Sequence, residues 1–275
     1  MIAGAGPVGL SMALGLERQG FAPLVLEKND IPAEHSRAPG ILPRTLEVFR
    51  AWGILDPFLE QGEFLQRPQI WSARTQSPVF SLDLRSLQGV TAESGVVILP
   101  QDKTEKLLRE ELLKSGRTEL RFGHELESFE QDEEGVTLNI KGGEAQRIRA
   151  KFLLGCDGAH SAVRAGLALP LEGETYPSRL MLADVRLSDA RNDLPWPRFF
   201  SLRKGVLAAL RIERNLWRII GTLEGRESEE EAVSRTSIES KVNKLFGPGE
   251  FELVWASIFR IHCRTSPHFR CGRVF

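Results

Sequence analysis

The feature that most constrains the fold is a glycine-rich turn within the first ten residues. Gly4, Gly6 and Gly9 follow the short apolar run at residues 1–3 and lead directly into residues 10–19, where apolar side chains recur at helical spacing. In such a strand–turn–helix the first glycine permits the tight turn, the second lets the backbone approach a pyrophosphate, and the third allows close packing of the helix on the strand. The free N–H groups and positive dipole end of the helix favour phosphates. Alone, the motif is weak evidence, because glycine turns of this shape also occur without a ligand.

The residues that follow supply the missing context. Residues 21–27 predict a buried parallel strand that ends in Glu27, which completes a β–α–β unit. An acidic residue at the end of that strand, about 20 residues beyond the turn, is placed to accept hydrogen bonds from the hydroxyls of an adenosine ribose. A carboxylate there disfavours a 2′-phosphate, so NADP is not expected at this site. The alternative interpretation of Glu27 is an ordinary surface carboxylate.

The rest of the chain is interpreted as short helices and strands. Helices are predicted at residues 43–52, 55–61 and 103–114. Alternating patterns and turn signals predict strands at residues 70–73, 79–82, 96–99, 119–122, 125–131 and 135–141, and a continuous apolar strand is expected at residues 150–156. A sheet-rich part is then expected, with one helix at residues 229–246 and strands at residues 176–187, 198–202, 206–213, 216–223 and 251–262.

Four motifs carry a resemblance to a known family. In chain order they are Gly4-Ala5-Gly6-Pro7-Val8-Gly9-Leu10, then Arg44-Thr45-Leu46-Glu47, then Leu99-Pro100-Gln101, then Gly155-Cys156-Asp157-Gly158-Ala159-His160-Ser161-Ala162-Val163-Arg164. Together they span more than half of the chain, and the last is the most specific. With these motifs the sequence resembles the class A flavoprotein monooxygenases, the group that includes para-hydroxybenzoate hydroxylase and the phenol and polyketide hydroxylases.

The resemblance implies an α/β fold, in which a Rossmann-like FAD-binding domain of the para-hydroxybenzoate hydroxylase type is joined to a sheet-rich substrate domain. The expected FAD-binding domain is discontinuous and comprises residues 1–68 and 98–168. Residues 69–97 and 169–268 would form the substrate domain, and residues 269–275 would begin the return to the FAD-binding domain.

The resemblance also implies a set of cofactor-binding residues: Gly4, Ala5, Gly6, Pro7, Val8, Gly9, Glu27, Lys28, Arg37, Arg44, Gln101, Leu126, Asp157 and Gly158. Arg44 can donate to phosphate or flavin oxygens as a fixed fork, or it can simply pair with Glu47 on the surface. Gln101 can reach a ribityl chain or cap its own helix. Asp157 is placed at the carboxyl edge of the sheet, where open α/β folds bind ligands.

The function implied is hydroxylation of an aromatic or phenolic substrate, with FAD as cofactor, NADPH or NADH as co-substrate, and dioxygen. The cofactor carries the hard chemistry, so no catalytic side chain is assigned and no metal site is expected. Arg164 and the partnerless His160 and His262 are interpreted as structural. The substrate is expected between the two domains, against residues 199–202 and 206–210. Two alternatives stay open: another flavin oxidoreductase, such as a halogenase or a reductase, and a non-catalytic binding protein on the same scaffold.

Composition excludes several other classes. A formal net charge of −1 and an isoelectric point near 6.6 argue against nucleic-acid binding. No apolar run approaches the roughly 18 residues of a membrane span. Three scattered cysteines match neither a disulfide framework nor a zinc pattern and indicate a reducing, cytoplasmic setting. Residues 268–275 resemble the run before the family's second FAD fingerprint, a glycine–aspartate pair, so we expect an incomplete chain that binds FAD weakly in isolation.

Overall fold

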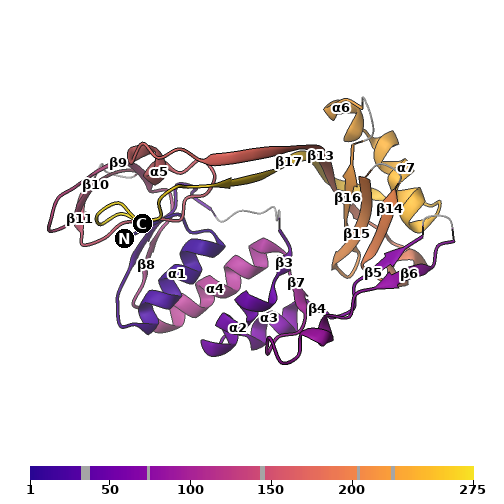
Figure 1. Ribbon diagram of the computed structural model, residues 1–275, viewed down its shortest axis with the longest axis horizontal. Coiled ribbons are helices and arrows are strands. Elements are labelled where there is room, and N and C mark those ends of the chain that lie inside the picture. Colours follow the sequence, from indigo (N-terminus) through magenta and orange to yellow (C-terminus); the bar gives the residue numbers. More distant parts are fainter. Residues whose placement is uncertain (32–37, 73–74, 143–145, 203–204, 224–226) are drawn as a thin grey trace.

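The computed structural model describes residues 1–31, 38–72, 75–142, 146–202, 205–223 and 227–275. The molecule is elongated, and two long antiparallel strands, β13 (Glu172–Arg186) and β17 (Glu252–Thr265), run between its two bodies (Figure 1). Among the described residues, none of the helices is both long and apolar enough to cross a lipid bilayer. The mixture of a parallel sheet with helices confirms the α/β class.

The first body is built on the predicted β–α–β unit. Its parallel sheet has the order β12-β1-β2-β8, and its members are β1 (Ile2–Ala3), β2 (Leu24–Leu26), β8 (Glu119–Arg121) and β12 (Leu154–Gly155). The first two strands are shorter than the apolar runs that predict them. The last residues of the chain return to this sheet: Phe275 N donates to Leu153 O at 2.9 Å, and Gly155 N donates to Phe275 O at 2.8 Å.

Helices and a small antiparallel sheet cover this unit. The helices are α1 (Pro7–Arg18), α2 (Pro43–Ala51), α3 (Asp56–Gln61) and α4 (Gln101–Ser115), and the small sheet has the order β3 (Gly40–Ile41), β7 (Val96–Ile98) and β4 (Glu63–Leu65). Their shared core contains Leu10, Leu14, Phe49, Phe58 and Leu108. Each such side chain contributes roughly 1.5–3 kcal/mol on burial, so α1 is held firmly between the sheet and α4.

A three-stranded antiparallel sheet lies beside this body, and its last strand shows that the single strand predicted at residues 150–156 is wrong. Its strands are β9 (Glu125–Gln131), β10 (Val136–Lys141) and β11 (Gln146–Ala150). The apolar run at residues 150–156 is not one strand, because Ala150 ends β11 whereas Leu154 and Gly155 form β12. β11 pairs antiparallel with β10 and β12 pairs parallel with β1, so the chain must turn between two sheets.

The second body is a seven-stranded sheet of order β17-β13-β16-β15-β14-β5-β6, as Figure 1 shows. The five further strands are β5 (Gln69–Trp71), β6 (Pro78–Ser81), β14 (Arg198–Leu202), β15 (Gly205–Glu213) and β16 (Leu216–Thr222). Residues 69–81 therefore join strands that follow them by more than a hundred positions. β7, which crosses the expected domain boundary at residues 97 and 98, pairs instead with β3 and β4.

The helix predicted at residues 229–246 is two helices, α6 (Glu229–Ala232) and α7 (Arg235–Phe246). The break has a local cause, since two serines six residues apart each cap a helix. Ser228 forms a capping box with Glu231, and the Ser234 hydroxyl accepts a hydrogen bond from Ser237 N. A capping side chain at Ser234 starts a new helix and ends the old one.

The two faces of the seven-stranded sheet differ. One face packs against α6 and α7 through a core that includes Phe200, Leu207, Trp217 and Ile219. Because strand residues alternate between faces, Arg218 lies on the opposite face, where it pairs with Asp184 directly across the β13–β16 register. Both hydrogen bonds of this bidentate pair measure 2.8 Å and the pair is buried.

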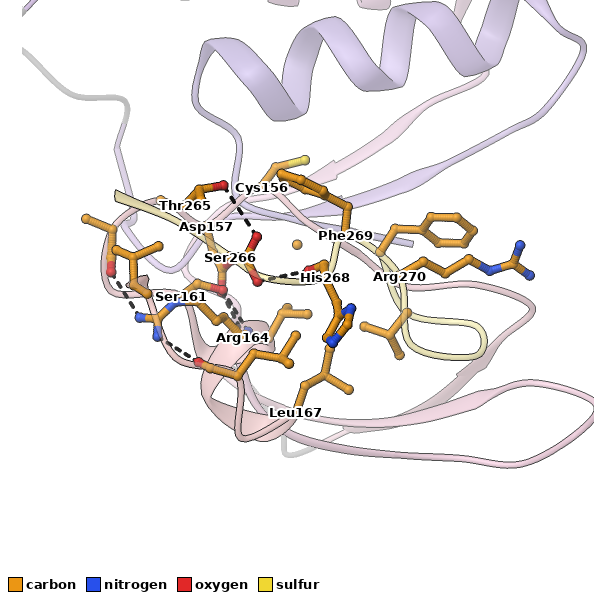
Figure 2. A pocket seen from close by; sticks show the side chains of 18 of the residues that line it. Cys156, Asp157, Ser161, Arg164, Leu167, Thr265, Ser266, His268, Phe269 and Arg270 are labelled. Atoms are coloured by element: carbon orange, nitrogen blue, oxygen red, sulfur yellow. Dashed lines mark hydrogen bonds between the residues drawn. The ribbon is translucent and has the colours of Figure 1, made fainter. Parts of the chain in front are cut away.

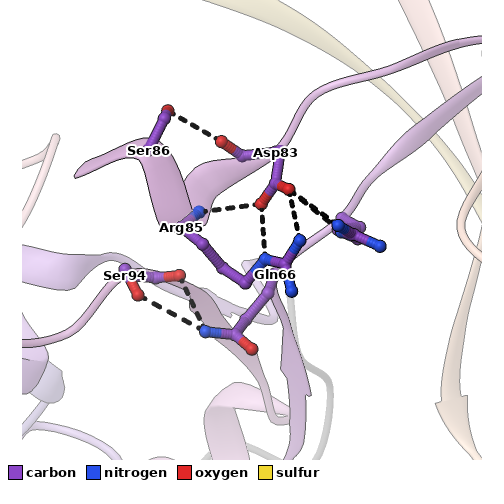
Figure 3. Close-up of polar contacts among 6 residues, drawn as sticks. Gln66, Asp83, Arg85, Ser86 and Ser94 are labelled. Carbon is purple, nitrogen blue, oxygen red and sulfur yellow. Dashed lines mark hydrogen bonds and ion pairs between the residues drawn. The ribbon is translucent and has the colours of Figure 1, made fainter. Parts of the chain in front are cut away.

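The chain crosses between the bodies through a braced linker. The chain leaves the first body at residues 66–68, and it returns at residues 82–94 through the 3-10 helix η1 (Leu84–Leu87). A second 3-10 helix, η2 (Ala190–Asp193), lies outside this linker and follows β13. Figure 3 shows the carboxylate of Asp83 accepting from Arg85 and from a second guanidinium, that of Arg67, while Gln66 Nε2 donates to Ser94 O at 3.3 Å. Exposed ion pairs of Lys103 with Glu213 and of Arg211 with Glu63 also join the bodies.

Candidate functional site

The predicted site residues meet in one cavity of about 510 Å³ at the carboxyl edge of the parallel sheet. Ten of the fourteen predicted residues line it, namely Gly4, Gly6, Pro7, Val8, Glu27, Lys28, Gln101, Leu126, Asp157 and Gly158. They come from the glycine turn, the end of β2, the start of α4, β9 and the loop after β12. Segments that lie far apart in the sequence therefore share a single site.

The glycine turn has the geometry that the motif requires. Gly4 has φ of +98°, and a Cβ there would lie 2.4 Å from the carbonyl oxygen of Cys156. A Cβ on Gly9 would lie 1.9 Å from Gly4 O, so this glycine lets α1 pack against the turn. At Gly6 a Cβ would meet no atom within 4 Å, which leaves the backbone open to the cavity. Gly6 caps α1 without a side-chain hydrogen bond, so the first N–H groups of the helix are available to an anion.

Glu27 closes the turn from the neighbouring strand. One carboxylate oxygen, Oε2, accepts from Ala5 N at 3.0 Å, and Oε1 accepts from Asn29 N at 3.1 Å and from Asn29 Nδ2 at 2.7 Å. The predicted residue Ala5 thus acts through its backbone and orients Glu27. A carboxylate held in this way still has lone pairs for the hydroxyls of a ribose.

Asp157 is held from below by the short helix α5 (Ala162–Gly166). Its Oδ2 accepts from Ala162 N at 2.7 Å and from Val163 N at 3.2 Å. Its other oxygen, Oδ1, is buried and has no hydrogen-bond partner among the described residues. A buried acceptor without a partner is costly, and a ligand hydroxyl would satisfy it. The residues at the cavity therefore fit a dinucleotide, with open backbone for phosphates and oriented carboxylates for hydroxyls.

Arg164, in the segment after Asp157, makes structural hydrogen bonds, as predicted. Its guanidinium donates to the carbonyl oxygens of Leu169 and Ala159, both at 3.2 Å, and Ser161 caps α5. Cys156, beside Asp157, is half-buried, and burial raises the pKa of its thiol to about 11. His160 lines the cavity, whereas His262, for which the sequence shows no partner, lies 2.8 Å from Thr175 Oγ1 on the strands that link the bodies.

One predicted arginine, Arg44, is not brought to the cavity. Arg44 is 88% exposed and forms an ion pair with Glu47, as in the alternative interpretation of that residue. Arg37 lies outside the described residues. Gln101 does line the cavity, and it does not cap α4, because its Nε2 donates to Glu105 Oε1 at 2.9 Å. Gly9 stands behind the turn, where it serves packing.

Two further cavities adjoin the first. One, of about 490 Å³, shares Val8, Cys156, Asp157 and Gly158 with it and is also lined by residues from the end of the chain. Figure 2 shows Asp157, Ser161 and Arg164 on one side of this cavity, and His268, Phe269 and Arg270 on the other. The other, of about 640 Å³, is mostly apolar, runs along α1 and shares Pro7, Val8 and Gln101 with the first.

The sequence analysis did not assign eight residues of the first cavity to the site: Ala3, Leu26, Asn29, His124, Glu125, Cys156, His160 and Ala162. Asn29 follows Glu27 by two positions, and that proximity is a usable signal. His124 and Glu125 are brought in because the segment after β8 pairs with the residues after β2, with His124 N donating to Glu27 O at 2.9 Å. No motif marks them.

Comparison with known proteins identifies the family. The whole chain, residues 1–275, matches a family described as an FAD binding domain. Rifampicin monooxygenase of Streptomyces venezuelae is 32% identical over all of this chain and 56% of its own length. A 3-(3-hydroxy-phenyl)propionate/3-hydroxycinnamic acid hydroxylase of Klebsiella pneumoniae is 31% identical over 99% of this chain and 49% of its own length. The chain thus spans about half the length of these relatives.

Solved structures agree with this assignment. The p-nitrophenol 4-monooxygenase PnpA of Pseudomonas putida superposes with a TM-score of 0.89 at 25% identity, over 99% of this chain and 70% of that one. The flavin-dependent monooxygenase PieE, solved in complex with FAD and substrate, gives a TM-score of 0.85 at 26% identity, over 100% of this chain and 51% of that one. The chain therefore belongs to the FAD binding domain family of the class A flavin monooxygenases.

Proposed function

We propose that the chain is the FAD-binding part of a flavin-dependent monooxygenase, which hydroxylates an aromatic or phenolic substrate with NADH or NADPH and dioxygen. The observation that carries the proposal is the convergence of the glycine turn, Glu27 and Asp157 on one cavity. The names of the relatives support the reaction class, because they are monooxygenases and hydroxylases. A cytoplasmic location is proposed with it, since the three cysteines are free thiols.

The residues of the cavity have distinct parts in holding the cofactor. The open backbone at Gly6 and the N-terminus of α1 would receive the pyrophosphate. Glu27 would accept from the ribose hydroxyls, and Asp157 Oδ1 from a further hydroxyl of the ligand. When bound, FAD supplies the redox chemistry, and the protein's task is to bind, to orient and to exclude water.

The substrate is proposed to lie against the face of the seven-stranded sheet that α6 and α7 leave uncovered. Among the residues expected to contact the substrate, Phe200 and Leu207 belong to the core beneath α7. Strand alternation then leaves Phe199, Ala208 and Leu210 for the opposite face. These three side chains carry no charge, which suits an aromatic ring. Pockets of this kind are common where two domains meet.

Cofactor binding is tested by titrating the chain with FAD and following flavin absorbance and fluorescence. Glu27→Gln should weaken FAD binding by about 10- to 100-fold, because a charge-assisted hydrogen bond to the ribose is worth about 1.5–3 kcal/mol. Glu239→Gln, an exposed change on α7, is the matched control and should bind like the unaltered chain. Equal affinity of the Glu27→Gln and Glu239→Gln variants would contradict the assignment of Glu27.

Oxygen transfer is tested separately, with flavin-loaded protein, NADH or NADPH, ¹⁸O₂ and a panel of phenols. One labelled oxygen atom in a hydroxylated product, detected by mass spectrometry, is the expected result. Oxidation of the pyridine nucleotide with no label in any phenol would contradict the hydroxylase assignment and leave the FAD titration unaffected.

A further inference from the structure

A histidine at one end of the first cavity is not explained by either binding motif. His124 lines the cavity together with Lys28, Asn29, Glu125 and Leu126. It follows β8 and is fastened to the neighbouring strand, since its backbone N–H donates to Glu27 O at 2.9 Å. The ring is therefore held next to the residue that the proposed function assigns to the ribose.

The tautomer of His124 follows from the hydrogen bond of its ring. Nδ1 lies 2.7 Å from the carbonyl oxygen of Phe122. A carbonyl oxygen can only accept, so Nδ1 carries the hydrogen, and in the neutral ring Nε2 is then an acceptor. Within the described part of the chain, Nε2 has no hydrogen-bond partner. The cavity thus has an acceptor of fixed identity at this end.

Glu27 joins two groups that flank the cavity: its Oε2 accepts a hydrogen bond from Ala5 N in the glycine turn at 3.0 Å, and its backbone oxygen accepts one from His124 N at 2.9 Å. The open backbone at Gly6 takes the phosphates and Glu27 takes the ribose, an order that rests on the proposed function. The base attached to that ribose would then lie past Glu27, against Asn29, His124 and Leu126.

We infer that His124 selects adenine, with Nε2 accepting a hydrogen bond from the exocyclic amino group of the base. Hypoxanthine carries a carbonyl oxygen at the same ring position, so two acceptors would face each other and the bond would be lost. The donor nearby, Lys28, is exposed and would favour hypoxanthine instead. His124 is therefore a specificity residue for the cofactor, and a preference for adenine reports on it.

The experiment compares ADP with inosine diphosphate by isothermal titration calorimetry of the unaltered chain at pH 8. ADP should bind about tenfold more tightly than inosine diphosphate. This ratio corresponds to the one hydrogen bond that Nε2 of His124 forms with adenine and cannot form with hypoxanthine. His124→Phe keeps a ring of similar size without the acceptor, so it should weaken ADP and remove the preference. His262→Phe, an exposed change on the strands that link the two bodies, should retain it.

The outcomes separate this inference from the proposed function. If neither nucleotide binds, the dinucleotide site itself is wrong. If both bind with equal affinity, or inosine diphosphate binds better, the site stands and the role of His124 is overturned. The ratio of the ADP affinity to the inosine diphosphate affinity is measured on the unaltered chain. It therefore tests the inference even if the His124→Phe protein does not fold. A folded variant with an unchanged tenfold preference overturns it as well.

Discussion

Glu105 shows how a single side chain couples α4 to the cofactor cavity. It is buried on α4 and holds Gln101, which lines the cavity, through a hydrogen bond of 2.9 Å. Burial raises the pKa of Glu105, although the hydrogen bond from Gln101 and the charge of Arg109 oppose the shift. The carboxylate is therefore retained at a cost to stability, and its position beneath Gln101 gives a reason.

The pKa shift predicts a pH-dependent effect of Glu105→Gln. A raised pKa means that Glu105 binds its proton more tightly in the folded protein than in the unfolded protein, where its carboxyl group has the ordinary pKa of 4.5. Stability from this group is present below that value and is lost as the pH rises through the raised pKa. Glutamine does not ionise, so the variant does not lose this stability as the pH rises. The Tm of the variant relative to that of the unaltered chain should therefore increase from pH 4 to pH 7. Calorimetry checks this, and Glu110→Gln, exposed on the same helix, should show no such trend.

At the level of elements, the turn into α1 separates two uses of glycine. Gly9→Ala should destabilise the fold by about 1–3 kcal/mol, because its methyl group would overlap Gly4 O and push α1 away. Gly6→Ala should leave stability almost unchanged, since Gly6 has φ of −72° and open space around it, yet it should weaken FAD binding. Urea unfolding and flavin titration of both variants measure this. A Gly6→Ala protein with full affinity would place the pyrophosphate elsewhere.

The element scale also shows what the sequence can and cannot predict. The β1–α1–β2 unit and the position of Asp157 at the sheet edge follow from local patterns, since glycines and apolar periodicity act over a few residues. The split of residues 150–156 does not, because it depends on which distant strands accept the two halves. Arg44 was expected at the cofactor by resemblance, and a neighbouring carboxylate at Glu47 holds it on the surface instead. His124 was missed because only the pairing of β2 with β8 brings it in.

At the scale of the whole molecule, each body has its own core, and the two ion pairs described between them are exposed. The ion pair of Lys103 with Glu213 joins the bodies, but exposed pairs are worth only about 0–1 kcal/mol. The pair of Arg218 with Asp184 lies inside the second body and is buried. The bodies are therefore positioned by the two long strands and the linker around Asp83 more than by ion pairs.

This contrast predicts the effect of two matched substitutions on unfolding. Asp184→Asn should lower the free energy of unfolding by about 3–5 kcal/mol, because it leaves the buried guanidinium of Arg218 without its counter-ion. Glu213→Gln should lower it by less than about 1 kcal/mol. Denaturant unfolding of both proteins checks the difference, and equal losses would show that the two bodies depend on the bridge between them.

Hydrogen–deuterium exchange with and without FAD locates the bound cofactor on the chain. We expect FAD to slow exchange in the segments that line the first cavity, at residues 4–10, 27–29, 124–126 and 157–163, and to leave α7 unchanged. Bound FAD that protects other segments, with no change at the glycine turn, would contradict this location of the cofactor.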